Sequence, residues 1–434
     1  MAHPIPDAAA LAEFAGRRAA LFEAAGEAIL LVPSAYVHLR NVDTSFPFFQ
    51  ESDFRYLCGF PEPDSLLVID PLTRQSILFV PPKDPERELW DGLRFGSAGA
   101  KEFFGVDAAF DSDDLGKELP RLLQGRSVMY TPPPADHPLK AAIDSAVAAQ
   151  AKGLVPDLRP ATVARLRRFK SPRELGFMRR AAAISAAAHV AAMRAGRKAT
   201  HEYQIEAAYY FSCLQAGARH QAYDAIVATG ANACCLHYQD NNAAIAPGDL
   251  ILIDAGCEVE GYASDITRTW PVSGRFTGPA RDLYALCLQV QKDAIARLRP
   301  GIGMRQAHIA TSRDLAEGLR QLGLLSGSVD EIMEKKQLSR FYPHGTSHHL
   351  GLDVHDVYRL PRDPKIDAPL EAGMVITVEP GLYVQSHDLL APAAFRGIGV
   401  RIEDDILITA DGHEILSAAC PKEIAELESI LQES

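Results

Sequence analysis

Acidic residues beside apolar segments constrain this chain more than any other feature of its sequence. Asp254, Glu379 and Glu403 each come at the end of a short apolar segment that predicts a buried strand. A fourth acid, Asp265, lies in the segment that follows the first of these strands. Burying several carboxylates together is strongly unfavourable unless cations neutralise them. The sequence therefore predicts a site in which the protein or bound cations balance this charge.

A predicted hairpin explains how two of these acids meet. Residues 250–253 form an apolar strand that ends at Asp254, and a turn through 258–261 leads into the alternating segment 262–270, which contains Asp265. Such alternation is typical of a strand that returns antiparallel to its predecessor. Acids on neighbouring strands can share one face of the sheet. We therefore expect Asp254 and Asp265 to meet there.

The donor atoms favour divalent metal ions over the simpler interpretation, a structural network of ion pairs. His348 adds one imidazole nitrogen to the four carboxylates, a set that suits Mn²⁺, Co²⁺, Fe²⁺ or Zn²⁺ better than a metal that prefers thiolates. A pair of divalent ions with a bridging hydroxide would balance the acids. Such a pair generates a nucleophile near neutral pH and stabilises a tetrahedral intermediate.

Charge and cysteine content exclude several classes of protein. The chain of 434 residues carries a formal net charge of −12 and has no basic tract, which argues against nucleic acid or an anionic membrane as a partner. We expect no membrane helix and no secretion signal, because no apolar run is long enough. Seven cysteines without C-x-x-C spacing predict reduced thiols. These features indicate a cytoplasmic protein.

The chain is predicted to form two domains, residues 1–160 and 161–434. The first mixes short apolar strands with helices, as in a compact α/β domain. The second opens at residues 171–174, where a serine, a proline and a glutamate have the spacing of a capping box. We expect strands at 65–69, 76–80, 374–378 and 400–402, and helices at 141–151, 202–215, 279–298 and 304–322.

Four motifs together resemble a known family. They lie at residues 254–256 with 264–269, at 344–356, at 378–383 and at 399–405. With these motifs the chain resembles the aminopeptidase P and prolidase family of dinuclear metallopeptidases. The resemblance extends to residues 54–60 and 88–90, so it spans both domains. It implies a fold of the α/β (α+β) class, with an N-terminal mixed α/β domain of the creatinase/prolidase type followed by a pita-bread metallopeptidase domain.

The resemblance implies the ligands of two divalent ions, with Mn²⁺ as the first choice and Zn²⁺, Co²⁺ or Fe²⁺ as alternatives. Asp265 and Glu403 would bridge the two ions, and Glu379 would also act as a general base. The implied ligand set is Asp254, Asp265, His348, Glu379 and Glu403.

Other residues would complete the active site by the same resemblance. His237 and His355 would act on the scissile carbonyl and the proline nitrogen, and Arg401 would also belong to the catalytic group. Simpler interpretations stand beside these roles: His237 as an ordinary hydrogen-bonded histidine, and Arg401 as a partner of Glu403 or Asp404. The residues implied to contact the substrate or support it are His344, Tyr383 and Trp90, of which Trp90 has a core aromatic as its simpler interpretation.

The predicted substrate is a small peptide with proline at its second position. A bond to proline is a tertiary amide without an N–H, so peptidases that grip an extended N–H are poorly suited to it. Tyr358 and Arg359 stand where the family usually has glycine. They would narrow the site, and Arg359 would pair with a free carboxylate; the alternative is an exposed loop without selectivity. We therefore expect an Xaa-Pro dipeptidase, with an Xaa-Pro aminopeptidase acting on longer peptides as the alternative.

Two other classes of function are less consistent with the sequence. A creatine-directed relative does not need the full ligand set, and methionine removal does not call for a large N-terminal domain. A promiscuous phosphotriester hydrolase is a further possibility on the same scaffold. A binding protein that had lost catalysis would usually have lost ligands, and all five are present here. We also expect a homodimer.

Overall fold

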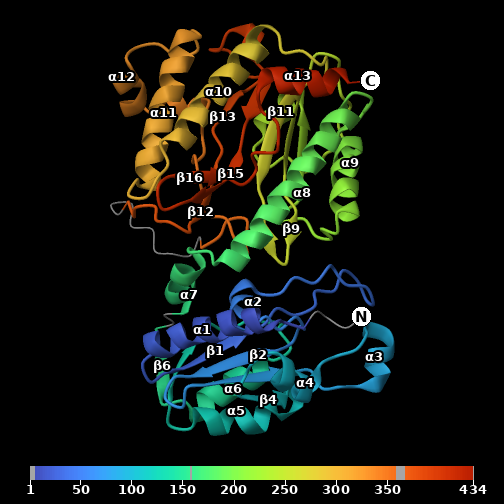
Figure 1. Ribbon diagram of the computed structural model, residues 1–434, viewed down its shortest axis with the longest axis vertical. Coiled ribbons are helices and arrows are strands. Elements are labelled where there is room, and N and C mark those ends of the chain that lie inside the picture. The colour runs from blue at the N-terminus through green and yellow to red at the C-terminus, as the bar shows by residue number, and fades with distance from the viewer. Residues whose placement is uncertain (1–4, 157–158, 358–366, 434) are drawn as a thin grey trace. The chain divides into compact units, whose positions relative to one another are not determined.

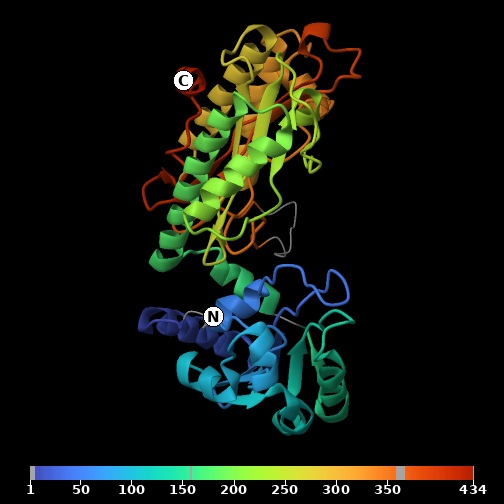
Figure 2. The same ribbon diagram turned by 90° about the vertical axis from the view of Figure 1, so that its right-hand side faces the viewer.

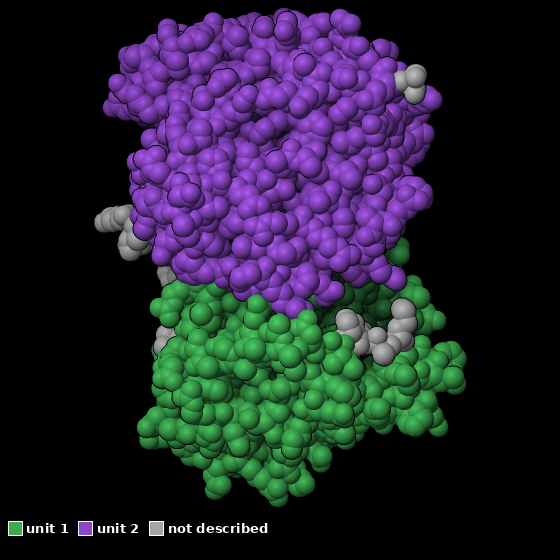
Figure 3. All heavy atoms as spheres, in the orientation of Figure 1, with its two compact units in different colours: residues 1–166, 359–361 green, residues 167–358, 362–434 purple. Residues whose placement is uncertain are grey.

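The computed structural model of the protein describes residues 5–156, 159–357 and 367–433. These residues form two compact units, of which the first ends at Leu166 and the second begins at Arg167 (Figure 3). The predicted domain boundary near residue 160 lies in α7, Arg159–Arg167, the helix that precedes the second unit.

The first unit is built on one six-stranded sheet in the order β4-β3-β2-β1-β5-β6. β1 pairs antiparallel with β2 and parallel with β5, so the sheet is mixed. Helices α1 and α2 lie over one face of the sheet, and α5 and α6 lie over the other (Figure 1). The strands are β1 Ile29–Pro33, β2 Leu66–Asp70, β3 Gln75–Val80, β4 Ala108–Asp111, β5 Ser127–Tyr130 and β6 Gly153–Val155, and the helices are α1 Ala8–Ala24, α2 Ser52–Cys58, α3 Pro85–Asp91, α4 Gly96–Phe103, α5 Leu115–Leu123 and α6 Lys140–Gln150.

Cover on both faces explains why the central strands are continuous apolar runs rather than alternating segments. Every residue of β1 and β2 is buried, and so is every residue of β3 after Gln75. Strands of this kind need helices on both sides. The predicted strands at 65–69 and 76–80 are confirmed as β2 and β3, and the predicted helix at 141–151 is confirmed as α6.

The second unit combines pairs of helices with short antiparallel sheets. α8 and α9 pack against each other and against β9–β11 and β7 respectively, while α10 packs against α11 and β12–β14. Figure 2 shows α8 and α9 side by side. The sheets have the orders β11-β8-β7, β12-β15-β16, β13-β14 and β10-β9. The elements are α8 Pro172–Gly196, α9 Glu202–Gln215, β7 Ile226–Thr229, β8 Leu250–Ala255, β9 Glu258–Val259, β10 Tyr262–Ala263, β11 Ile266–Pro271, α10 Gly278–Ala296, α11 Met304–Gln321, α12 Val329–Glu334, β12 Val375–Val378, β13 Gly381–Val384, β14 Ile398–Arg401, β15 Asp404–Ile408, β16 His413–Ile415 and α13 Ile424–Gln432.

Local signals in the sequence explain where several of these elements begin. Ser171 accepts a hydrogen bond from the backbone N–H of Glu174, whose carboxylate accepts one from the backbone N–H of Ser171, so the predicted capping box starts α8. Glu260 and Gly261 both have positive φ, which is the turn geometry that suits the twist of the β9–β10 hairpin. The helices predicted at 202–215, 279–298 and 304–322 are confirmed as α9, α10 and α11.

Two expectations drawn from composition can be compared with the structure. Within the described residues, no helix combines the length and the apolar character needed to span a membrane. All seven cysteines are free thiols, as predicted, and only Cys235 among them is exposed.

Candidate metal centre

Two strands and a tyrosine gather the first pair of acids. Asp254 lies near the end of β8, and Asp265 lies just before β11, whose register sets Thr267 opposite Asp254. Asp265 is therefore a diagonal neighbour of Asp254 rather than its direct partner. The Tyr223 hydroxyl spans the gap, 2.6 Å from Asp254 Oδ1 and 2.5 Å from Asp265 Oδ1. The two acids thus meet at the hairpin.

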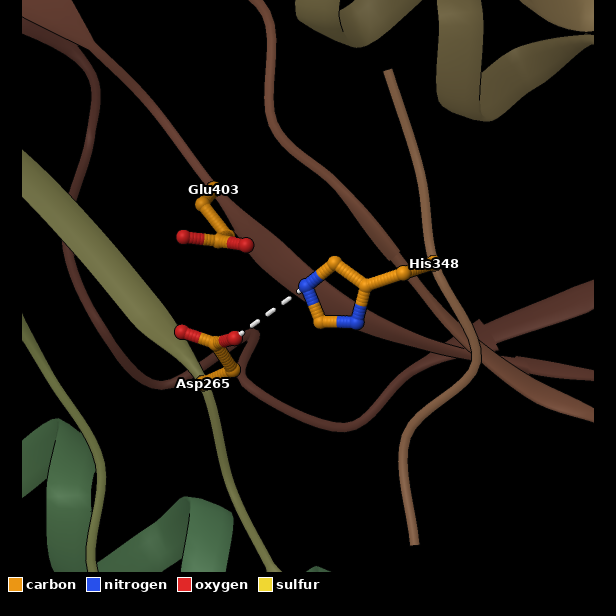
Figure 4. Close-up of side chains that lie close together, drawn as sticks. All are labelled: Asp265, His348 and Glu403. Carbon is orange, nitrogen blue, oxygen red and sulfur yellow. Dashed lines mark ion pairs between the residues drawn. The ribbon is translucent and has the colours of Figure 1, made fainter. Parts of the chain in front are cut away.

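His348 directs one ring nitrogen at the acids. Its Nε2 lies 3.4 Å from Asp265 Oδ2 and 3.7 Å from Glu379 Oε1, while its Nδ1 lies 3.0 Å from the carbonyl oxygen of His349. An Nδ1–H that donates to this carbonyl leaves Nε2 available to a cation. Figure 4 shows Asp265, His348 and Glu403 converging, with one ligand atom from each within 4.8 Å of the others.

The two glutamates of the cluster lie just after the ends of strands, as the sequence predicts. Glu379 follows β12, and its backbone N–H donates to the carbonyl oxygen of Thr346 in the loop that leads to His348. Glu403 lies between β14 and β15, where its backbone N–H donates to the carbonyl oxygen of Thr267. The Thr267 hydroxyl in turn donates to Glu403 Oε2 at 2.7 Å. Thr267 therefore holds Glu403 against β11.

Burial and mutual repulsion raise the pKa values of three of these carboxyl groups. Burial, together with the charges of Asp265 and Glu379, raises the pKa of Glu403 well above its usual value. Burial, partly offset by His348, also raises the pKa of Asp265 and raises that of Glu379 to about 7. Burial lowers the pKa of His348, but Asp265 and Glu379 outweigh it and raise that pKa to about 9. The cluster therefore favours added positive charge, in the form of protons or metal ions.

One arginine reaches the cluster from β14. Arg401 Nη2 lies 2.6 Å from Asp254 Oδ2, and both side chains are buried. Burial acts to raise the pKa of Asp254, but Arg401 and the Tyr223 hydroxyl lower it further than burial raises it. The simpler interpretation of Arg401, an ion pair with Glu403 or Asp404, is wrong, because its carboxylate partner is Asp254. A single guanidinium does not balance four carboxylates.

The donor set fits divalent metal ions. Tyr223 has one hydroxyl hydrogen, so it donates to only one of Asp254 and Asp265 at a time, and the other oxygen needs a proton or a cation. His348 offers Nε2 in the tautomer that binds a metal. Four carboxylates with one imidazole are typical ligands of Mn²⁺, Fe²⁺, Co²⁺ or Zn²⁺.

A hydrogen-bonded chain leads from Arg401 to a histidine. Arg401 Nη1 donates to the Tyr383 hydroxyl oxygen at 2.9 Å, and that hydroxyl lies 2.9 Å from His344 Nε2. His344 Nδ1 lies 2.8 Å from the carbonyl oxygen of Gly345, so an Nδ1–H leaves Nε2 to accept from the tyrosine. Burial, helped by the charge of Arg401, lowers the pKa of His344 to about 4. His344 is therefore neutral near pH 7.

Two further histidines lie beside the cluster, and both are exposed. The ring centroids of His355 and His348 are 4.5 Å apart, and the planes are nearly perpendicular. Desolvation lowers the pKa of His355, and the charges of His348 and His237 lower it further. His237 is thus close enough to His355 for the two to interact electrostatically. Exposed imidazoles next to a buried acidic cluster are well placed to contact a substrate that enters from solvent.

Comparison with known proteins identifies the family. The profile of metallopeptidase family M24 matches residues 176–410, and the profile of the aminopeptidase P N-terminal domain matches residues 14–130. The chain belongs to metallopeptidase family M24. The family and the two-domain fold predicted from the motifs are thereby confirmed.

Known M24 relatives, and solved structures of other proteins, are similar to this chain over nearly its whole length. It is 41% identical over 422 residues to the Xaa-Pro aminopeptidase of Haemophilus influenzae, covering 96% of this chain and 97% of the relative. It is 37% identical to human Xaa-Pro aminopeptidase 3, covering 94% and 81% respectively. Its fold matches the aminopeptidase PepP of Pseudomonas aeruginosa with a TM-score of 0.91 and 40% identity, covering 97% and 98%. A zinc-substituted aminopeptidase P of Escherichia coli in complex with product matches with the same TM-score and coverage at 38% identity.

Of the residues predicted to contact the substrate, one lies in the first unit and two lie outside the described residues. Trp90 is on α3 with 85% of its surface exposed, so its simpler interpretation as a core aromatic is wrong. Its contact with the substrate stays a prediction. Tyr358 and Arg359 lie outside the described residues.

Sequence reasoning missed two residues that contact the candidate metal ligands. Tyr223 touches Asp254 and Asp265, and Thr267 touches Glu403. Thr267 lies on β11, two positions after Asp265, which directly precedes that strand; side chains two positions apart in extended chain point to the same side. That spacing is a usable signal, whereas nothing in the local sequence marks Tyr223.

Proposed function

We propose that this chain is a metal-dependent Xaa-Pro aminopeptidase, which removes the N-terminal residue that precedes a proline. The observation that carries the proposal is the buried group of four carboxylates and His348, whose charge the protein leaves unbalanced. Relatives named Xaa-Pro aminopeptidase, aligned over nearly the whole chain, support the choice of substrate. The match of the N-terminal domain supports it further, because that domain is named after aminopeptidase P.

The predicted preference for dipeptides receives no support. The relatives that match both units are named as aminopeptidases, so the alternative, cleavage of longer peptides with proline second, is the better proposal. The prediction depended on Tyr358 and Arg359, which lie outside the described residues.

We propose two divalent ions as the cofactor, held by the predicted ligand set. Bound there, they would supply a nucleophile at neutral pH and a Lewis acid for the scissile carbonyl. Mn²⁺ is the first candidate, and Zn²⁺, Co²⁺ and Fe²⁺ are the alternatives that oxygen-rich ligands also accept. The proposed ligands are Asp254, Asp265, His348, Glu379 and Glu403, with Asp265 and Glu403 shared between the ions.

The chain's own residues would move and hold protons around the reaction. Glu379, whose Oε2 lies 3.5 Å from His344 Nδ1, is the proposed general base. His237 and His355, at the exposed side, are proposed to contact the scissile carbonyl and to protonate the leaving proline nitrogen. Tyr383, hydrogen-bonded to Arg401 and His344, holds both in a fixed orientation beside the site.

Peptide cleavage by the chelated and reconstituted protein tests this proposal. We expect release of the first residue from an Xaa-Pro-Yaa tripeptide, loss of activity on chelation and recovery with Mn²⁺ or one of its alternatives. An Xaa-Ala-Yaa tripeptide is the matched control and should be cut far more slowly. Absence of cleavage with all four metals, or equal cleavage of the control, contradicts the proposal.

Comparing Xaa-Pro with Xaa-Pro-Yaa decides the length preference, and faster turnover of the dipeptide would restore the original prediction. We also propose a homodimer. Sedimentation equilibrium measures the molecular mass in solution and tests this directly.

A further inference from the structure

The loop between β7 and β8 carries His237, and several of its residues donate hydrogen bonds to one buried glutamate. Glu202 is the first residue of α9 and is completely buried. Its carboxylate accepts hydrogen bonds from both ends of the loop and from its middle. We define this loop as residues 229–243, and call it the His237 loop.

Five donors from the His237 loop converge on this carboxylate. Glu202 Oε1 accepts from the Thr229 backbone N–H at 2.7 Å, from the Thr229 hydroxyl at 2.8 Å and from Asn232 Nδ2 at 3.2 Å. Glu202 Oε2 accepts from the Tyr238 hydroxyl at 2.8 Å and from the Ala243 backbone N–H at 2.9 Å. One side chain thereby ties together the start, the middle and the end of the loop.

The charge of Glu202 gives these contacts their strength. In the part of the chain that the structure describes, no lysine or arginine forms a salt bridge with it, so neutral donors stabilise the carboxylate. Hydrogen bonds to an ionised acceptor are about twice as strong as those between neutral groups. The position at the start of α9 helps, because the N-terminal end of a helix favours negative charge. The buried charge is satisfied only when the His237 loop is folded onto it.

The far side of the His237 loop packs on the strands that carry other site residues. Gln385 Nε2 donates to the carbonyl oxygen of Cys234 at 3.0 Å. A side chain at Gly399 would lie 2.4 Å from the carbonyl oxygen of Ala233, so β14 and the loop approach as closely as glycine permits. Tyr383 lies on β13, which pairs with β14. The loop is thus held between Glu202 and the β13–β14 pair.

We propose that Glu202 is a positioning residue for His237. The Tyr238 hydroxyl, bound to Glu202, fixes the backbone next to His237, and the remaining four bonds fix the loop on either side. Glu202 touches neither the substrate nor the proposed ions and acts only through the loop. The catalytic part of this inference rests on the proposed Xaa-Pro peptidase function, while the structural part does not.

Glu202→Gln tests the proposal with little change in shape. The amide keeps one acceptor oxygen and replaces the other with an NH₂ donor, so the donors at one end of the carboxylate lose their acceptor. Glu174→Gln is the matched control, because Glu174 is also a buried glutamate in the first turn of a helix and accepts from a tyrosine hydroxyl, that of Tyr262 at 2.7 Å. Both variants should lose some stability, but only Glu202→Gln should loosen the His237 loop.

Two measurements on the full-length, metal-loaded protein follow. Hydrogen–deuterium exchange should accelerate across residues 229–243 in Glu202→Gln and stay at the wild-type rate there in Glu174→Gln. On Xaa-Pro-Yaa, kcat should fall about a hundredfold in Glu202→Gln, because small misplacement of a catalytic group costs that much. KM should change less than kcat, and adding Glu202→Gln to His237→Ala should cause no further loss.

Each outcome decides the inference. Unchanged exchange in the His237 loop of Glu202→Gln overturns it, and so does full additivity of the two substitutions. If Glu202→Gln does not fold, Tyr238→Phe removes one of the five bonds and should show the same pattern with a smaller amplitude. A wild-type protein that cleaves no Xaa-Pro-Yaa overturns the proposed function, while the exchange measurement still decides whether Glu202 orders the loop.

Discussion

Glu403 and Asp404 are neighbours in the sequence, but their carboxylates lie in very different electrostatic surroundings. Asp404 is contacted by Arg268 at 2.7 Å and by Lys422 at 2.5 Å. Burial acts to raise its pKa, but these two cations outweigh it and lower the pKa to about 2. Glu403 has a hydroxyl, that of Thr267, as its contact at 2.7 Å, and its pKa lies well above the usual value.

This difference in pKa distinguishes a carboxylate that the fold itself neutralises, Asp404, from one suited to bind an added cation, Glu403. Both side chains are buried, so burial alone does not distinguish them. What differs is the positive charge that the fold supplies: Arg268 and Lys422 both contact Asp404, whereas among the described residues no lysine or arginine forms an ion pair with Glu403. A buried charge is tolerated when it is paired, and an unpaired one is expected to take up protons or metal ions. The comparison predicts opposite responses to substitution at the two positions.

Glu403→Gln should abolish activity while sparing the metal-free fold. Metal-ion catalysis supplies several kcal/mol, so we expect at least an approximately thousandfold loss of turnover on Xaa-Pro-Yaa. The chelated variant should be as stable as the chelated wild type, or more stable, because a neutral amide replaces a carboxyl group whose charged form is disfavoured at that buried position. Kinetics and urea unfolding measure the two effects. Retention of a tenth of the activity contradicts the metal assignment.

Asp404→Asn should show the reverse pattern. Removing one member of a buried pair leaves Arg268 and Lys422 without their carboxylate, which costs about 3–5 kcal/mol of unfolding free energy. Urea unfolding of the chelated protein measures this cost, and metal content per folded molecule should stay at the wild-type value. A loss below about 1 kcal/mol would show that Asp404 is not a structural anchor.

Tyr223→Phe should weaken metal binding without removing a ligand. Its hydroxyl orients Asp254 and Asp265, and loss of such an orienting contact typically costs 10- to 100-fold in metal affinity. Competition with a chromophoric chelator measures the affinity. Tyr262→Phe, whose hydroxyl bonds to Glu174, is the control and should bind metal normally. Equal affinities in the two variants would remove Tyr223 from the site.

The smallest expected effect is that of acid, which should reduce the contribution of Asp404 to the free energy of unfolding. Its pKa is about 2 when folded, below its ordinary value of 3.8, so its stabilisation is complete above pH 4 and is lost as pH falls toward 2. The shift corresponds to about 2 kcal/mol, of which roughly half is lost by pH 3. The difference in unfolding free energy between chelated wild type and Asp404→Asn should therefore shrink between pH 5 and pH 3. A constant difference would mean that the charge of Asp404 does not stabilise the fold.

Prediction from sequence succeeded where the signal is local. The capping box at Ser171 and the apolar segments before Asp254, Glu379 and Glu403 were enough to place α8 and the strands that carry the acids. Periods of two and of 3.6 residues are properties of single segments, so they can be read without knowing the fold. The family motifs, which are short and contiguous, were read in the same way and led to the correct family.

Contacts between distant segments could not be predicted in this way. Arg401 pairs with Asp254, 147 positions away, rather than with its neighbours Glu403 or Asp404. The Tyr223 hydroxyl reaches Asp265 across 42 positions, and Glu202 reaches Ala243 across 41. These partners depend on strand register and helix packing, which no single segment encodes.

The sequence by itself determined the elements, the family and the residues able to bind metal, because each follows from local chemistry and spacing. Only the tertiary structure decided which buried carboxylates the protein neutralises and which it leaves to cations. Charge balance depends on distances between side chains, and those distances exist only after β8, β11, β12 and β14 have assembled. That is why Glu403 and Asp404 look alike along the chain and differ so much in the folded protein.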